Sequence, residues 1–270
     1  DGTKFFYVNP LELIPAVAKR RYECHLVKTQ RVGWFGCACC PPNVARLFAS
    51  LGEYLASQRP DGLALHLYTD SEVRFTAGGH DVSLAMRTDY PWTQDVTLTV
   101  KPAAAVEFTL WLRIPGWCRG ARVTLNGEAQ PLAPVHGYAA LRRAWRTGDV
   151  VVLTLPMPVE RIHADPRVAT VAGQVALQRG PVVYCFEEPD NGANLAALTL
   201  PRTAPLDAQW EPATLGGCVT IAAPGTRDRG EATLYSAAPR ESEPVTLRAI
   251  PYGLWANRGE GEMRVWLREG

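Results

Sequence analysis

Hydrophobic and polar positions follow two different spacings along the chain, and the change falls near residue 60. From 43 to 58, apolar side chains recur at the spacing of one helix face, at Val44, Leu47, Phe48, Leu51 and Leu55. This spacing predicts a helix that starts near Pro41-Pro42, because proline at the first helical position loses no needed N–H. The segment Arg59 to Gly62, which reads RPDG, is typical of a turn that ends the helix.

Beyond Gly62 the apolar positions alternate with polar ones, as in a β-strand. Residues 106–114 carry apolar side chains on one face and Glu107, Thr109, Trp111 and Arg113 on the other. This alternation predicts a half-buried antiparallel strand. Asn126-Gly127 is a strong hairpin-turn signal, and further short strands follow with Gly and Pro between them.

The fold class that these patterns predict is mainly β: two consecutive antiparallel β-sandwich domains preceded by a short helical segment. Roughly 200 residues of strand pattern exceed one sandwich, which typically has about 100 residues. We therefore divide the chain into the helical segment 1–60, a first sandwich over 61–164 and a second over 165–270.

Composition and charge exclude several classes of partner. The 270 residues are 47% hydrophobic and 20% charged, which is enough apolar material for a core without disulfides. With 28 basic and 27 acidic residues the net charge is +1. The chain therefore lacks the excess of basic residues that is typical of nucleic-acid-binding proteins. No apolar run has the length of a membrane span, and the first residues do not resemble a signal peptide. We expect neither a nucleic-acid nor a membrane partner.

The seven cysteines are odd in number and unevenly spread, with Cys24, Cys37, Cys39 and Cys40 in the first 40 residues. A disulfide framework would show paired spacings in a short secreted chain. We therefore expect reduced thiols and a cytoplasmic location.

Cys39 and Cys40 stand at the predicted helix N-terminus, where unpaired N–H groups and the helix dipole favour an anion such as a thiolate. Thiolates are also preferred ligands for zinc. Three interpretations stay open on the residues alone. The cluster is a set of small buried side chains, a structural zinc site to which Cys24 or His25 adds ligands, or a catalytic cysteine assisted by a metal.

Several segments resemble glycoside hydrolase family 127, the β-L-arabinofuranosidases. They read FFYVNPLE, WFGCACCPPNVARL, LWLRIPGWC, LPMPVERI, GQVALQRGPVVYC and PYGLWANRGEGEMRVWL, and they extend over essentially the whole chain. The Cys-Cys-Pro-Pro-Asn motif is highly specific. The resemblance implies an (α/α) barrel followed by two β-sandwich domains, so that residues 1–60 would be the last part of the barrel.

The resemblance also implies a mechanism. Family members hold a zinc ion with three cysteines and a glutamate, and one of two adjacent cysteines attacks the anomeric carbon with retention of configuration. By motif, Cys39 matches the nucleophile and a zinc ligand, Cys40 matches a second ligand, and Tyr7 matches a tyrosine that lines the sugar pocket. The expected substrate is a terminal β-L-arabinofuranosyl group.

The remaining parts of that site have no counterpart in this sequence. The family's Glu-x-Cys ligands and its general acid/base lie upstream of the tyrosine motif, and Glu23 stands directly beside Cys24, which is a different spacing. We expect the C-terminal part of such an enzyme, inactive as an isolated chain. Its protein partner would be a second copy in a homodimer or a complementing barrel fragment.

Two other functions compete with this interpretation. The eight tryptophans are compatible with a non-catalytic carbohydrate-binding module, and Trp111 stands out because it falls on the polar face of its strand. The cysteines alone are compatible with a structural zinc module. The adjacent Glu187 and Glu188 are not a glycosidase pair, because neighbouring strand residues point to opposite faces. We expect both to be solvated.

Overall fold

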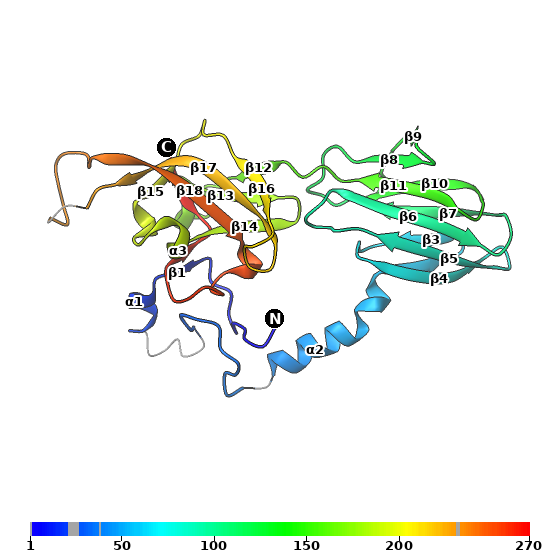
Figure 1. Cartoon of the computed structure of the whole chain (residues 1–270), viewed down its shortest axis with the longest axis horizontal. Coiled ribbons are helices and arrows are strands. Elements are labelled where there is room, and N and C mark those ends of the chain that lie inside the picture. Colours follow the sequence, from blue (N-terminus) through cyan, green and yellow to red (C-terminus); the bar gives the residue numbers. More distant parts are fainter. Residues whose placement is uncertain (1, 21–26, 38, 231–232) are drawn as a thin grey trace. The chain divides into compact units, whose positions relative to one another are not determined.

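The computed structural model describes residues 2–20, 27–37, 39–230 and 233–270. The chain divides into two compact units. The middle unit comprises residues 39–158, and the terminal unit comprises 1–38 together with 159–270. The boundaries that the sequence suggests, after 60 and after 164, stay predictions. The mainly β fold class is confirmed, with strands in both units and few short helices (Figure 1).

The middle unit begins with the helix α2 (Cys40–Ser50) and a 3-10 turn, η2 (Leu51–Tyr54). The sequence prediction of helix as far as residue 58 is wrong in its last part. Residues 56–59 form the strand β2, because their backbone pairs with residues 62–65 across the RPDG turn. Local apolar spacing cannot reveal this pairing, since it depends on a partner strand beyond the turn.

Two sheets follow in the middle unit. The first has the order β10-β7-β3-β2, with β10 (Tyr138–Trp145), β7 (Val106–Arg113), β3 (Gly62–Leu65) and β2 (Ala56–Arg59). The second has the order β4-β5-β6-β11-β8-β9, with β4 (Ser71–Ala77), β5 (His80–Arg87), β6 (Asp95–Pro102), β11 (Asp149–Thr154), β8 (Arg122–Leu125) and β9 (Glu128–Gln130). The hairpin signal is confirmed: Asn126 and Gly127 join β8 to β9 with φ of 51° and 85°.

One apolar core lies between these two sheets. The alternating strand over 106–114 is confirmed in part, because Val106, Phe108, Leu110 and Leu112 of β7 are all buried in this core. The expectation of a purely antiparallel, half-buried strand is wrong, since β7 pairs antiparallel with β10 but parallel with β3, and Thr109 on its other face is buried as well. Trp145 is fully buried beside Phe108, with ring centroids 5.5 Å apart, and its Nε1 donates to the Phe108 carbonyl oxygen at 2.9 Å. The indole N–H is thereby satisfied where water cannot reach it.

The described part of the terminal unit forms one sheet of ten strands. Its order is β1-β19-β14-β18-β17-β15-β20-β13-β12, with β16 paired to β17. Additional hydrogen bonds between β13 and β14 close six of these strands into a ring. The strands are β1 (Glu12–Leu13), β12 (Val159–Ile162), β13 (Gln174–Arg179), β14 (Val182–Glu187), β15 (Leu198–Leu200), β16 (Asp207–Glu211), β17 (Cys218–Asp228), β18 (Ser242–Pro251), β19 (Met263–Arg264) and β20 (Leu267–Glu269).

Short helices connect these strands: α1 (Pro15–Ala18), η3 (Ala169–Val171), α3 (Glu188–Asn191), η4 (Leu195–Ala197) and η5 (Tyr252–Leu254). Alternation along the ring strands builds two apolar cores. Tyr184 and Phe186 of β14 belong to the core that all six ring strands share. Cys185, between them, belongs to a second core with Leu13 and Trp255. The N-terminal segment therefore packs on the outer face of the ring.

Candidate active site

Tyr7 and Cys37 meet in the terminal unit. The Tyr7 hydroxyl lies 3.3 Å from Cys37 Sγ. Phe5 and Val32 form an antiparallel bridge with two backbone hydrogen bonds of 2.9 and 3.1 Å, which brings the two segments together. The ring of Phe35 lies 5.5 Å from that of Tyr7. Sequence reasoning predicted Tyr7 as a site residue but missed its contact with Cys37.

Cys39 and Cys40 meet at the start of α2, in the middle unit. Cys39 is the N-cap residue and Cys40 the first helical residue, so the predicted helix start is confirmed. Pro41 and Pro42 have no N–H, and they remove two of the donors that a helix N-terminus usually offers to an anion. The side-chain amide of Asn43 donates to the Cys39 carbonyl oxygen at 2.7 Å. Both cysteines are exposed.

The separation of these two thiols tests whether they suit a zinc ion. Their sulfur atoms lie 3.7 Å apart. Two sulfurs bound to a tetrahedral zinc, each at about 2.3 Å, are separated by about 3.8 Å. The pair therefore fits two corners of a zinc site. Among the residues that the structure describes, no three His, Cys, Asp or Glu side chains gather as a complete metal site. Cys24 and His25 lie outside the described residues.

The apolar face of α2 is present at the predicted spacing, but none of its residues is buried. Phe48 is 69% exposed, and Val44, Leu47 and Leu51 are also exposed. No helix in the described part of the chain is long and apolar enough to span a membrane.

The tryptophans differ in what they offer to a sugar. Trp111 is half-buried: the Arg59 guanidinium lies 4.6 Å from its ring centroid, and its Nε1 donates to Asp61 at 3.2 Å. Its surface is therefore engaged within the middle unit. Trp34 and Trp210 are 58% and 53% exposed.

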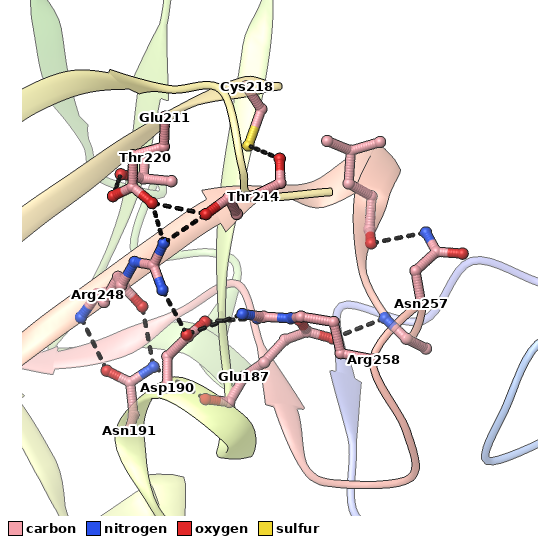
Figure 2. Close-up of polar contacts among 12 residues, drawn as sticks. Glu187, Asp190, Asn191, Glu211, Thr214, Cys218, Thr220, Arg248, Asn257 and Arg258 are labelled. Atoms are coloured by element: carbon pink, nitrogen blue, oxygen red, sulfur yellow. Dashed lines mark hydrogen bonds and ion pairs between the residues drawn. The ribbon is translucent and has the colours of Figure 1, made fainter. Parts of the chain in front are cut away.

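A network of guanidinium and carboxylate groups lies beside the second core of the terminal unit (Figure 2). Arg258 donates to Asp190 at 2.8 Å and to Glu187 at 2.6 Å. Arg248 donates to Asp190 at 2.8 Å and forms an ion pair with Glu211. Glu187 is 4% exposed, so the prediction that it is solvated is wrong. A buried carboxylate needs partners, and Arg258, far away in sequence, supplies them.

Hydrogen bonding and burial shift the pKa values of Glu211 in this network and of Cys185 beside it. Hydrogen bonds from Thr214 and Thr220 hold the pKa of Glu211 below its ordinary value. Burial raises the pKa of the Cys185 thiol, so this cysteine stays protonated and unreactive at neutral pH. The network carboxylates are engaged by guanidinium groups, which favours a structural role for them over acid/base catalysis.

Three family models match the chain in succession. The Beta-L-arabinofuranosidase GH127 catalytic domain matches residues 1–53, the GH127 middle domain matches 62–157, and the Glycoside hydrolase family 127 C-terminal domain matches 159–268. The site residues Tyr7, Cys39 and Cys40 thus all fall in the catalytic match.

Individual relatives agree with these models. A non-reducing end β-L-arabinofuranosidase of Bifidobacterium longum subsp. longum is 39% identical over 99% of this chain and 42% of its own length. The crystal structure of a GH127 β-L-arabinofuranosidase from Geobacillus stearothermophilus T6 is 52% identical, with a TM-score of 0.94 over all of this chain and 43% of its own. A structure described as a GH127 β-arabinofuranosidase is 32% identical, with a TM-score of 0.88 over all of this chain and 42% of its own.

The chain spans about two fifths of the length of these relatives. Within that span, sequence and fold agree from the first described residues to the last. This chain therefore belongs to glycoside hydrolase family 127 and comprises part of its catalytic domain, its middle domain and its C-terminal domain.

Proposed function

We propose that these residues serve a zinc-dependent retaining glycoside hydrolase that releases terminal β-L-arabinofuranose. Cys39 is the nucleophile, Cys39 and Cys40 are zinc ligands, and Tyr7 lines the sugar pocket. The observation that carries the proposal is the pair of thiols 3.7 Å apart at the start of α2, inside the segment that the catalytic family model matches.

The chemistry follows from the cysteine. The Cys39 sulfur attacks the anomeric carbon, the bond to the leaving oxygen breaks, and that oxygen takes a proton from a general acid. A thioglycosyl group is then carried on Cys39. The residue that acted as general acid then deprotonates a water molecule, which displaces the sulfur from the anomeric carbon. This second inversion restores the original configuration. A bound zinc ion would keep the thiols deprotonated and tune the sulfur as a leaving group.

In this proposal the remaining zinc ligands, a Glu and a Cys, and the general acid/base come from a barrel segment outside these 270 residues. We therefore infer that the chain alone does not turn over arabinofuranosides. Its protein partner is that barrel segment or a second copy of the chain. The proposed location is the cytoplasm, and it is supported by the uneven spread of the seven cysteines along the sequence.

The test compares Cys39→Ser with Cys118→Ser, a half-buried cysteine of the same unit. In the whole enzyme we expect about one zinc per chain, and Cys39→Ser should lose both zinc and turnover while Cys118→Ser keeps them. An aryl arabinofuranoside with a fast leaving group should load one pentosyl unit on the peptide that holds Cys39. A pentosyl unit on another residue, or full activity of Cys39→Ser, would contradict the proposal.

Exposed Trp34 and Trp210 support a second candidate, a non-catalytic module that binds carbohydrate. It predicts that Cys39→Ser binds arabinan oligosaccharides as tightly as the parent chain. The third candidate, a structural zinc module, predicts that a chelator unfolds the chain and does not simply stop turnover.

A further inference from the structure

We propose that the loop 252–258 of the C-terminal domain is a positioning element for the active site: Trp255 holds Phe6 and Arg31, and thereby sets Tyr7 against Cys37. This inference rests on the proposed function, in which Tyr7 lines the sugar pocket. It assigns a role to the PYGLWANRGEGEM segment, which contributes neither a nucleophile nor a metal ligand to that function.

Two segments carry the Tyr7–Cys37 pair: the first comprises residues 5–10 and the second residues 31–37. Stacking on Trp255 holds the first segment. The rings of Phe6 and Trp255 are 4.2 Å apart between centroids and inclined by only 1°. Trp255 is 2% exposed and belongs to the second core of the terminal unit, so its indole has a fixed place. The Tyr252 hydroxyl also donates to the Pro10 carbonyl oxygen at 2.8 Å. Tyr7 lies directly between these two attachment points in the sequence.

The second segment is held by Arg31. Its Nε donates to the Trp255 carbonyl oxygen and its Nη2 to the Gly253 carbonyl oxygen, each at 2.9 Å. The guanidinium carbon lies 5.3 Å from the centroid of the Phe6 ring, so Arg31 contacts both the loop and the first segment. One loop thus fixes both segments, and six residues beyond Arg31 the chain reaches Cys37.

The loop itself is fixed by the buried network (Figure 2). The Ala256 N–H donates to Glu187 at 2.6 Å, and Ala256 adopts a positive φ of 56°. Arg258 donates to Glu187 and Asp190. A non-glycine residue keeps this backbone conformation only where its surroundings impose it. The buried network therefore fixes the loop, and the loop in turn fixes the segments that contain Phe6 and Arg31.

The placement of Tyr7 matters because a misplacement of about 1 Å in an active site, even when the mutation that causes it is far away, can lower the rate about 100-fold. Trp255 does not touch the Tyr7–Cys37 pair in this scheme, so it is a positioning residue. Removing the stacking should loosen the Tyr7–Cys37 contact, while the first core of the terminal unit, to which Trp255 does not belong, persists.

The first readout uses the 270-residue chain and does not depend on catalysis. We expect Trp255→Leu to speed iodoacetamide alkylation of Cys37, mapped by mass spectrometry, by about 2- to 10-fold, the factor that corresponds to loss of an aromatic pair. Trp255→Phe, which keeps a ring, should restore most of the protection. Tyr235→Leu is the matched control, because Tyr235 is an exposed aromatic residue of the same unit. If Trp255→Leu does not fold, Arg31→Lys should give the same direction of change.

The second readout is steady-state kinetics of the whole enzyme. Trp255→Leu should lower kcat/KM for an aryl arabinofuranoside by about 10- to 100-fold, Trp255→Phe should recover most of it, and Tyr235→Leu should behave as the parent. Unchanged Cys37 alkylation in folded Trp255→Leu overturns the positioning role. Faster alkylation with unchanged kinetics leaves that role standing and overturns the role proposed for Tyr7.

Discussion

Replacing Glu187 by glutamine removes one buried charge from the network of the terminal unit while keeping the size of the side chain. In the parent chain this carboxylate accepts hydrogen bonds from the Ala256 N–H and from Arg258, each at 2.6 Å. A glutamine has only one acceptor oxygen, so one donor loses its partner and faces an NH₂ group. Arg258 keeps its contacts to Asp190, which limits the damage.

The magnitude follows from these contacts. A hydrogen bond to a charged group contributes about 1.5–3 kcal/mol, and breaking a buried ion pair costs about 3–5 kcal/mol. Because Arg258 retains one carboxylate, we expect a loss near the lower end, about 3 kcal/mol. With a slope of about 2 kcal/mol per molar urea, the unfolding midpoint of the terminal unit should fall by about 1.5 M.

The assay is pulse alkylation of Cys185 across a urea titration. The Cys185 thiol is fully buried on β14, two residues before Glu187. It can therefore react only when the terminal unit unfolds. Glu241→Gln is the control, because Glu241 is an exposed carboxylate of the same unit paired with Arg229, and its loss should cost less than about 0.5 kcal/mol. A shift below about 0.3 M for Glu187→Gln would refute the reasoning and show that the buried pair only compensates its own desolvation.

Three further predictions concern other parts of the two units. Trp145→Ala should destabilise the middle unit by about 4 kcal/mol, because it empties a fully buried site and leaves the Phe108 carbonyl without its donor; urea unfolding measures this. Gly62→Ala should cost about 3 kcal/mol in the same assay, since a Cβ there would lie 2.0 Å from the Thr109 carbonyl oxygen; an unchanged midpoint would contradict the pairing of β3 with β7. The lowered pKa of Glu211 stabilises the fold above its unfolded value of about 4.3, and this contribution disappears as the pH falls through the lower folded value, so Glu211→Gln should flatten the acid limb of the stability curve.

Much of the fold could be predicted because its determinants are local. The alternation over 106–114 became β7, the Asn126-Gly127 signal became the β8–β9 turn, and Cys40 begins α2. Each of these depends on neighbours within a few residues, and side-chain period, turn geometry and missing N–H groups act at that range.

The candidate site could be predicted only in part from local sequence patterns. Cys39 and Cys40 are adjacent in sequence, so the motif alone brings both thiols to the start of α2, and the structure adds that their sulfur atoms lie 3.7 Å apart. Tyr7 and Cys37 are 30 residues apart, and their contact depends on the Phe5–Val32 bridge and on the loop around Trp255, more than 200 residues away. The aromatic residues in the segments FFY and YGLW were a signal that these segments bury rings, but not that they bury them against each other.

The sequence by itself determined the mainly β class, the start of α2, the hairpin turn and the family, because periodicity and motif need no knowledge of distant partners. Only the tertiary structure decided that Ala56 to Arg59 is a strand, that Glu187 is buried, and that Trp255 reaches Phe6. The physical reason is the same in each case. Strand pairing, burial of a charge and stacking of rings all depend on a partner that the chain brings near only when it folds.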